Sequence, residues 1–586
     1  MNPADRHSVE TTYDATVRED IEFFRSKALE FSEGKFDADA FRPHRLRRGI
    51  YTQRQPGVHM IRTKVPGGIV TVAQWRRLAD VAKEFANGKA HLTTRQNVQY
   101  HFIPLLQVAD LLHRLADVRL TTREACYNTV RNVTACPYAG LIADEPFDVR
   151  PYAQVCAFAF LHQDIADNLP RKFKIAFSGG HDDSIATDIN DMGFRAVIKD
   201  GQRGFRVTIG GGLGPLPNEA ALLDEFLPDD KVVQRAEAVI RIFGKFGNRS
   251  NKNKARLKFV LRERGLEWVK EQIEIEYKDI LENGGVPVPT TLPDGFGGFE
   301  FEPVGHSRNL PILQPAAKPS HPGFDEWART NVETGKNPAY AIVTVKIAQG
   351  NLTDEQMYKL ADIAEQNGDG QLRLTMTQNL LLANIPAANV ARVYDGLVAI
   401  GLADPGAREI DDITNCPGAY SCNLALTKSM NLGEALAAVV KQERDPLARK
   451  LQIHISGCPN SCGQHWTGDF GFYGNARKID GKEVPYYQML LGGGYDENRM
   501  MRYGFAIQSI PARLAPVAIQ RVLEHYKQDR QEGETFRQYV SRNKVEFFRK
   551  MTADLAKPAE TFPELYQDWG DDVGYSLQLG RGECAA

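Results

Sequence analysis

The sequence predicts an α+β protein that contains one internal duplication. Short segments recur 282 residues apart in the same order, and Arg62-Thr63-Lys64-Val65 corresponds in this way to Thr344-Val345-Lys346-Ile347. In each half a strand–helix–strand pattern comes first, and a longer segment of mixed character follows. This order favours antiparallel or mixed sheets. A single long repeat also differs from a solenoid, which shows many short periods.

The elements of the first half are expected in a clear order. Residues 17–33 have the pattern of an exposed amphipathic helix. A strand is expected from His59 to Val65, where a Pro-Gly-Gly turn ends it, and a helix from Val72 to Ala86. A second strand is expected from His91 to His101.

The second half repeats these elements with small shifts. Leu374–Leu380 follows Leu92–Val98 by 282 residues, whereas Cys416 follows Cys136 by 280. Small insertions within a duplicated unit explain this drift. A Pro/Gly-rich stretch from about 283 to 322 separates the two halves, because the periodicity fails there.

The composition limits the class of protein. With 586 residues, 42% apolar and 25% charged, the chain is long enough for two to four soluble domains. A net charge of −2 gives no general attraction for nucleic acid, so no such partner is expected. The N-terminus lacks the apolar segment of a signal peptide, and no apolar run reaches the ~18 residues that cross a bilayer. The eight cysteines lack the spacing of a disulfide framework, so we expect a cytoplasmic protein with no membrane partner.

Four of the cysteines form two closely spaced pairs. Cys416 and Cys422 have five residues between them, and Cys458 and Cys462 have three. Four thiolates suit a tetrahedral zinc ion or a [4Fe–4S] cluster. The five-residue spacer is long for a zinc site, so the spacing favours the iron–sulfur cluster first, zinc second and four unrelated core cysteines last.

The residues around the second pair carry a longer motif. Gly457-Cys458-x3-Cys462 is followed by Asp469-Phe470-Gly471-Phe472, and this arrangement resembles the signature of the sulfite and nitrite reductases that contain sirohaem and a [4Fe–4S] cluster. The resemblance covers roughly residues 30–560. It implies that the four cysteines bind the cluster and that Cys462 also ligates the sirohaem iron. It further implies two ferredoxin-like half-domains that pair into one domain, and two α/β domains that bind the cofactors.

The family plan, applied to the repeats, divides the chain into seven parts. They are an N-terminal extension (1–44), ferredoxin-like half-domain 1 (45–110), a substrate- and sirohaem-binding domain (111–282), a linker (283–335), half-domain 2 (336–405), a [4Fe–4S]- and sirohaem-binding domain (406–560) and a C-terminal tail (561–586). One cofactor pair is expected, because Cys136 has no second cysteine nearby and Gly180 stands where Cys458 would be.

Reduction of an oxyanion requires positive charge around it. Arg62 and Lys64 are two positions apart on an expected strand, so they share a face. Lys172 and Lys174 have the same relation. Taken alone, each is more often a solvated charge at a strand edge. The resemblance implies that four basic residues bind the substrate, with arginines to grip the anion and a lysine to pass protons: Arg62, Arg131, Lys172 and Lys174.

Sirohaem carries many carboxylates and needs donors around it. Residues 93–99 resemble the macrocycle-binding strand of the family, and residues 248–258 resemble a second carboxylate-binding segment. If the second segment is a strand, its alternating bases share one face; if a helix begins there, they spread around it. Such a charge run is ordinarily a solvated face. The implied contacts are Arg95, Gln99, Arg171, Lys254, Arg256 and Lys258.

The resemblance implies a six-electron reduction. Lys174 stands where nitrite-preferring relatives commonly have Asn, and an added cation suits a dianion, so reduction of sulfite to sulfide is favoured over reduction of nitrite to ammonia. No flavin or nicotinamide module is evident, so the electrons are expected from a separate protein, a ferredoxin or otherwise a flavoprotein. The alternatives are a zinc-binding protein with a basic face, and a dissimilatory subunit that works only in a complex. Three histidines are expected in the core or behind the ligands: His101, His454 and His465.

Overall fold

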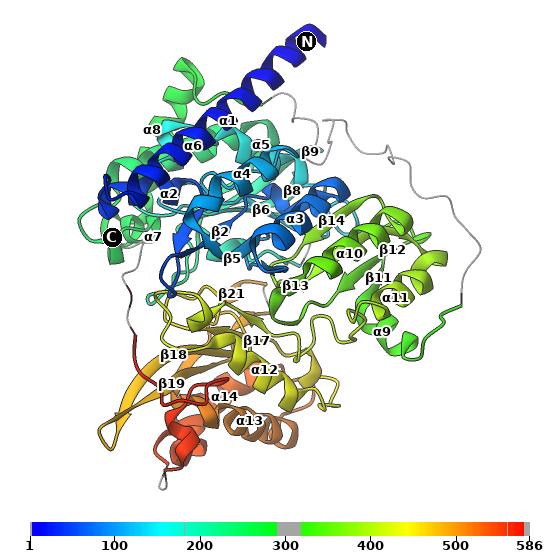
Figure 1. Ribbon diagram of the computed structural model, residues 1–586. Coiled ribbons are helices and arrows are strands. Elements are labelled where there is room, and N and C mark those ends of the chain that lie inside the picture. Colours follow the sequence, from blue (N-terminus) through cyan, green and yellow to red (C-terminus); the bar gives the residue numbers. More distant parts are fainter. Residues whose placement is uncertain are drawn as a thin grey trace.

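The computed structural model describes residues 3–180, 182–289, 318–497, 499–558, 561–578 and 580, with side chains from Ala15 onward. Two ferredoxin-like half-domains lie side by side, blue and green in Figure 1, and two α/β domains adjoin them. This arrangement confirms the predicted α+β class and the duplication. The range 283–335, expected to be a linker, includes α9 (Phe324–Asn331) and β11 (Val332–Thr334). Residues 290–317 and Cys584 lie outside the described residues.

Each half-domain contributes one strand to the sheet of the other. The strands, besides β11, are β1 (Ile50–Thr52), β2 (Val58–Arg62), β3 (Ile69–Thr71), β4 (Lys89–Leu92), β5 (Val98–Pro104), β12 (Tyr340–Val345), β13 (Asn351–Thr353), β14 (Gln371–Leu374) and β15 (Leu380–Pro386). The two sheets have the orders β1-β2-β5-β4-β13 and β11-β12-β15-β14-β3. β13 pairs antiparallel with β4, and β3 pairs antiparallel with β14. This exchange joins the half-domains around one continuous apolar core.

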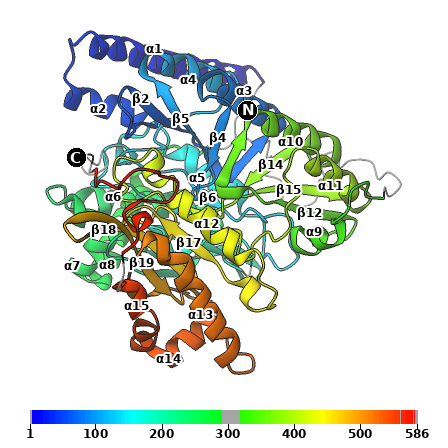
Figure 2. The ribbon, with the colours of Figure 1, turned by 60° about the horizontal axis from the view of Figure 1, so that its bottom comes forward.

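The helices of the two half-domains also correspond. They are α3 (Val72–Phe85), α4 (Val108–Ala116), α10 (Asp354–Asn367) and α11 (Val390–Val398). Thr71 caps α3 and Thr353 caps α10, each in a capping box with a glutamine three residues later. Trp75 Nε1 donates to the carbonyl oxygen of Met357 at 2.9 Å, which links equivalent positions of the two repeats. Figure 2 shows α10 next to α3, and the two helices are in contact.

Each α/β domain has one mixed five-stranded sheet. The first is β10-β9-β8-β7-β6 and the second is β16-β17-β18-β19-β22. In both, two parallel pairings lead into antiparallel ones. The strands are β6 (Thr134–Ala135), β7 (Ile175–Ser178), β8 (Met192–Lys199), β9 (Gln202–Ile209), β10 (Ala221–Pro228), β16 (Thr414–Asn415), β17 (Ile453–Ser456), β18 (Phe470–Ile479), β19 (Lys482–Leu491) and β22 (Phe505–Pro511). The main helices are α5 (Arg150–Ala159), α6 (Val232–Phe246), α7 (Leu257–Arg264), α8 (Leu266–Asn283), α12 (Ser429–Val440), α13 (Ala515–Asp529) and α14 (Phe536–Met551).

The two α/β domains contact each other through side chains of the second domain. Trp466 Nε1 donates to the carbonyl oxygen of Gly214 at 3.0 Å. Tyr495, in the short strand β20 (Gly494–Tyr495), donates its hydroxyl to the carbonyl oxygen of Asp183 at 2.5 Å. Trp466 lies four residues after Cys462, so its contact holds the cysteine segment against the glycine-rich loop of the first domain, residues 210–214.

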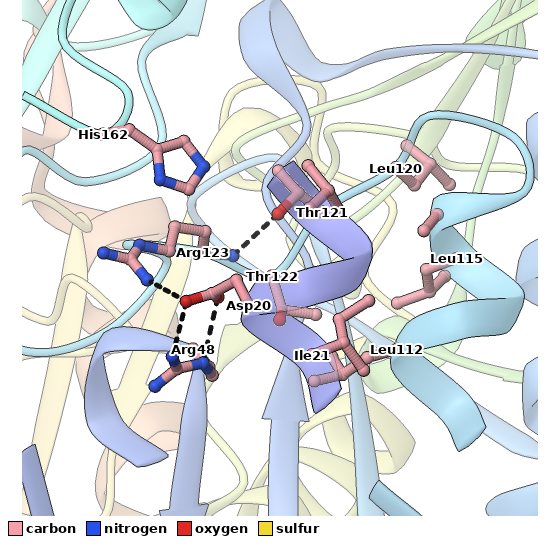
Figure 3. A pocket seen from close by; sticks show the side chains of 12 residues that line it. Asp20, Ile21, Arg48, Leu112, Leu115, Leu120, Thr121, Thr122, Arg123 and His162 are labelled. Carbon is pink, nitrogen blue, oxygen red and sulfur yellow. Dashed lines mark hydrogen bonds and ion pairs between the residues drawn. The ribbon is translucent and has the colours of Figure 1, made fainter. Parts of the chain in front are cut away.

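Ion pairs hold the N-terminal helix α1 (Pro3–Ser32) against the first half. Asp20 accepts from Arg48 Nε at 3.0 Å and from Arg123 Nη1 at 3.0 Å (Figure 3). A cavity of about 20 Å³ lies beside this group, with His162 and apolar residues of α1 and α4 around it. Arg123 lies eight residues before Arg131 in the same connecting segment. The ion pair of Asp20 with Arg123 therefore links α1 to the segment that contains Arg131, an expected substrate residue.

Three local predictions were wrong or incomplete. The expected strand from His91 to His101 is two antiparallel strands, β4 and β5, because residues 93–97 form a turn. The first strand ends at Arg62, and Lys64 lies beyond it, buried against Glu124 at 3.2 Å. The N-terminal helix is longer than residues 17–33.

No helix in the described ranges is long and apolar enough to cross a membrane.

Candidate functional site

The four cysteines of the motif gather at one edge of the second α/β sheet. Cys416 directly follows β16, and Cys458 follows β17 by one residue. β16 and β17 are parallel neighbours, so their carboxyl ends lie together and bring the two pairs into one place. Burial raises the pKa of Cys416 and Cys458, and it raises that of Cys422 to about 12. The negative charge of Cys462 is the second cause in all three. The other three thiols therefore lie near enough to Cys462 to be affected by its charge.

This donor set fits a metal cluster. Four thiolates this close repel one another unless metal ions neutralise them. In the part of the chain that the structure describes, no three His, Cys, Asp or Glu side chains are grouped around a single metal ion. Four cysteine thiolates are the ligand set of a [4Fe–4S] cluster.

Backbone contacts fix the cysteine loops. The amide of Gly457 donates to Cys416 Sγ at 3.3 Å, and the Ser429 hydroxyl lies 3.4 Å from the same sulfur. A Cβ at Gly457 would lie 2.7 Å from the carbonyl oxygen of Thr427, so only glycine allows this approach. Thr94, on the turn before β5, donates its hydroxyl to the carbonyl oxygen of Cys462 at 2.9 Å. The expected macrocycle-binding turn is therefore in direct contact with the last cysteine.

The C-terminal segment packs on the loop of Cys422. Tyr575 donates its hydroxyl to the carbonyl oxygen of Leu426 at 2.8 Å, and the amide of Gly580 donates to the carbonyl oxygen of Asn423 at 3.1 Å. From the first half-domain, the amide of Arg54 donates to the carbonyl oxygen of Ser421 at 3.0 Å. Segments from both ends of the chain thus hold this loop.

Two of the expected substrate residues share a tyrosine. Arg62 lies over the ring of Tyr51, with 6.0 Å between its guanidinium carbon and the ring centre, and its Nε donates to Gln99 Oε1 at 2.8 Å. Arg131 Nη2 contacts the hydroxyl of Tyr51 at 3.4 Å, and Arg131 Nε donates to the carbonyl oxygen of Tyr127 at 2.9 Å. The fold therefore brings Arg62 and Arg131 together, although 69 positions separate them in the chain.

Arg95 lies between these arginines and the first α/β domain. Its Nη1 donates to Asn190 Oδ1 at 2.7 Å, and its Nη2 donates to the carbonyl oxygen of Asn132 at 2.6 Å. Burial lowers the pKa of Arg95 to about 9, and the charges of Arg131, Arg256 and Arg62 contribute to the decrease. Arg95 is consequently in the same electrostatic neighbourhood as three other expected site residues.

The lysines lie in an extended segment directly before β7. Arg171, Lys172 and Lys174 are half-buried there. Burial lowers the pKa of Lys174 well below its usual value, and three cations act in the same direction: Arg95, Lys172 and Arg256. The structure thus gathers Arg62, Arg95, Arg131, Lys172, Lys174 and Arg256 into one cationic group, which we call the basic pocket.

Of the two structures considered for the segment with Lys254, Arg256 and Lys258, the helix start is the one that forms, so the three bases do not share a strand face. Lys254 ends a 3₁₀ turn and is exposed, while α7 begins after Arg256. Asn251 Oδ1 accepts from the amide of Asn253 at 3.1 Å, and such side-chain capping favours turns and helix starts over strands. Arg256 is buried against Asp191. Lys258 Nζ donates to the carbonyl oxygens of Gly212 at 3.3 Å and Leu213 at 3.0 Å, so it holds the glycine-rich loop.

Unused donors make the pocket suitable for an anionic macrocycle. Arg95 Nε is buried and has no hydrogen-bond partner among the described residues. His101 Nε2 lies 3.4 Å from Gln99 Nε2, which makes it an acceptor and leaves the proton on Nδ1, also without a partner in the described ranges. Buried donors rarely stay unpaired, so a ligand with acceptors fits here.

Sequence reasoning missed one central residue, Asp191. It was missed because a lone aspartate before a strand has no motif of its own. The repeat contained the signal, since Asp191-Met192-Gly193-Phe194 stands in the first half where Asp469-Phe470-Gly471-Phe472 stands in the second.

The chain belongs to the nitrite and sulfite reductase family. Residues 126–281 and 406–559 match the nitrite and sulphite reductase 4Fe–4S domain, which includes all four motif cysteines. Residues 51–123 and 334–400 match the nitrite/sulfite reductase ferredoxin-like half domain. The protein is therefore an oxidoreductase of this family with an iron–sulfur centre.

Similar proteins include both kinds of reductase. The assimilatory ferredoxin-dependent nitrite reductase of Haloferax mediterranei is 30% identical over 94% of this chain and 92% of its own. Sulfite reductase [ferredoxin] 2 of Mycolicibacterium paratuberculosis is 29% identical over 84% of this chain and 87% of its own. Among solved structures, the Mycobacterium tuberculosis NirA protein superposes with a TM-score of 0.74 and 27% identity, over 88% of this chain and 92% of that one. The identity to these two kinds of reductase differs by one percentage point, so it does not distinguish the substrate.

Proposed function

We propose that this protein reduces sulfite to sulfide with six electrons, at a sirohaem coupled to the [4Fe–4S] cluster. The observation that carries the choice of sulfite is the half-buried Lys174 within the basic pocket. Sulfite can carry two negative charges and nitrite only one, so an added cation favours sulfite. Nitrite is the second candidate substrate, because relatives at 30–31% identity are nitrite reductases.

The pocket residues divide the work of binding and proton supply. Arg62 and Arg131 keep their charge and can grip an oxyanion through paired donors. Lys174 has a lowered pKa, so it can give up a proton near neutral pH more readily than an ordinary lysine. Each oxygen that leaves as water takes two protons, and Lys172 and Lys174 are placed to deliver them.

The cofactors would be held by groups from three domains. Cys416, Cys422 and Cys458 would bind the cluster, and Cys462 would bind the cluster and the sirohaem iron. When bound, this pair supplies electrons to the substrate one at a time. The remaining expected residues would contact the carboxylates of the sirohaem. Arg95 offers a buried Nε that has no hydrogen-bond partner among the described residues. The full set is Arg95, Gln99, Arg171, Lys254, Arg256 and Lys258.

A separate ferredoxin is the proposed electron donor, with a flavoprotein as the alternative. The relatives above are named as ferredoxin enzymes. Docking of such a donor is expected to be electrostatic, so turnover with ferredoxin should fall as salt increases. Turnover with a small dye donor should change much less. Equal salt dependence with both donors would contradict electrostatic docking.

Lys174→Asn tests the choice of substrate. The substitution removes one cation from the basic pocket, so kcat/KM for sulfite should fall by about 10-fold or more while kcat/KM for nitrite stays within a few-fold. The control is Lys199→Asn, an exposed lysine at the end of β8 outside the basic pocket, which should leave both values unchanged. A wild-type enzyme with the higher kcat/KM for nitrite would overturn the sulfite proposal and leave the cofactor assignment intact.

A further inference from the structure

Asp191 is a buried carboxylate inside the basic pocket. Its side chain is 0% exposed. Arg256 donates to both of its oxygens, from Nε to Oδ1 at 2.9 Å and from Nη2 to Oδ2 at 2.6 Å. The amide of Lys174 donates to Oδ2 at 2.9 Å. One carboxylate therefore fixes the orientation of one cation and the backbone of another.

The backbone of Asp191 extends this role to the glycine-rich loop. Its carbonyl oxygen accepts from the amide of Gly210 at 2.9 Å. Lys258 also holds this loop. Burial lowers the pKa of Lys258 to about 7; the charge of Arg256 lowers this pKa further, and the charge of Asp191 raises it. Asp191 is thus connected to three segments of the pocket: the lysine segment, the glycine-rich loop and the start of α7.

The duplication supplies an internal comparison. Asp469 is the repeat counterpart of Asp191, and its Oδ2 accepts from the amide of Gln452 at 2.9 Å, as Asp191 does from Lys174. Its carbonyl oxygen accepts from the amide of Gly492 at 2.8 Å. Gln452 is an amide where Lys174 is an amine, and burial raises the pKa of Asp469 to about 7, with the charge of Arg537 acting against the increase. The backbone frame is common to both halves, and the bidentate pair with an arginine belongs to the first.

We propose that Asp191 is a positioning residue of the oxyanion site, which orients Arg256 and the Lys174 segment and places a negative charge among the cations there. The proposal rests on the assignment of the basic pocket as the substrate site. It adds a carboxylate to a site made otherwise of cations.

The charges that face Lys174 set the sign of the effect. The cations are Arg95 from the turn before β5, Lys172 from its own segment and Arg256 from the start of α7. Asp191, directly before β8, is the carboxylate that opposes them. Removal of its charge should therefore lower the pKa of Lys174 further, and removal of the Arg256 charge should raise it.

The test compares Asp191→Asn with Asp469→Asn in the cofactor-loaded enzyme. Two quantities are measured against pH: sulfite affinity, from the change in the absorption spectrum of the oxidised enzyme, and kcat/KM. In Asp191→Asn, the alkaline limb of both profiles should move to lower pH by about one unit or more. At a fixed pH on this limb, sulfite affinity and kcat/KM should each fall by about 10-fold or more, whereas at lower pH, before the limb begins, they should change little. Asp469→Asn should leave the limb in place. A limb that stays in place in Asp191→Asn, or an equal loss at every pH, would overturn the proposal.

Arg256→Met keeps the proposal testable if Asp191→Asn does not fold. This variant leaves the carboxylate in place without its cation, so the alkaline limb should move to higher pH, opposite to Asp191→Asn. A shift to lower pH would contradict the proposal. If the wild-type enzyme binds no sulfite at any pH, the proposed substrate fails, and the same titrations with nitrite then test Asp191 separately.

Discussion

Gln96 and Gln378 make matching hydrogen bonds across the boundary between the two halves. Gln96 Nε2 donates to the carbonyl oxygen of Leu374 at 2.8 Å, and Gln378 Nε2 donates to that of Leu92 at 2.9 Å. Both glutamines have a positive φ, 53° and 66°, at equivalent turns. Each half-domain thus uses one side chain to bind the last residue of a strand in the other, β14 or β4.

The same side chains also reach the α/β domains. Gln96 Oε1 accepts from the amide of Ala135 at 3.0 Å, and Gln378 Oε1 accepts from that of Asn415 at 2.8 Å. Ala135 precedes Cys136, whereas Asn415 precedes Cys416, a proposed ligand of the cluster. One symmetric contact therefore supports a proposed cluster ligand in the second half and a buried cysteine in the first.

Gln378→Ala should destabilise the fold and also disturb the cluster. Loss of the side chain leaves the buried amide of Asn415 unpaired, at a cost of about 1–3 kcal/mol. Gln96→Ala is the matched variant, with a similar cost, and the amide that it leaves unpaired belongs to Ala135, next to Cys136. Thermal unfolding, iron per chain and the spectrum of the reduced cluster measure the two effects. An identical cluster spectrum in both variants would contradict the prediction.

Cys462→Ser should remove the connection between cluster and sirohaem and abolish sulfite reduction. Serine is a poor ligand for iron in a site built for thiolates. Cys136→Ser, at the vestigial position, should keep the full iron content and most of the activity. Iron per chain and turnover with a dye donor check both variants. Retained sulfite reduction in Cys462→Ser would contradict the bridging role.

Lys64→Met should cost about 3–5 kcal/mol of stability, because it leaves a buried charge without its partner. Lys64 and Glu124 have side chains only 2% and 0% exposed, and they pair at 3.2 Å. Glu124→Gln in the same chain removes the unpaired charge, so the double variant should recover part of the loss. Thermal unfolding of both single variants and the double variant measures the coupling. A cost below about 1 kcal/mol for Lys64→Met would show that water reaches the pair.

His91 should make the fold less stable in acid. Burial lowers its pKa from 6.5 to about 4. Below pH 6.5 the unfolded chain therefore takes up a proton that the folded chain refuses, so stability falls as pH decreases from about 6.5 to about 4, by up to ~3 kcal/mol. His91→Gln should flatten the profile of melting temperature over this range. The exposed His321→Gln is the control, and an unchanged profile in His91→Gln would contradict the prediction.

Local signals made part of the molecule predictable. The helix after the first strand begins at Val72 as expected and ends one residue before the expected Ala86, because a capping threonine and apolar periodicity act over a few residues. The run from His91 to His101 was misjudged because a tight turn at Gln96 lies inside a strand-like composition. The positive φ there is a property of the backbone that alternation of residue types does not reveal.

The order of residues alone is sufficient to predict the duplication, the cysteine site and the family, because repeats and motif spacing survive without knowledge of the fold. The exchange of β3 and β13, the pairing of Asp191 with Arg256 and the pairing of Lys64 with Glu124 became apparent only in the folded chain. The paired residues are 65 and 60 positions apart in the chain. A charge has no preferred partner until packing excludes water and brings one particular opposite charge within hydrogen-bond distance.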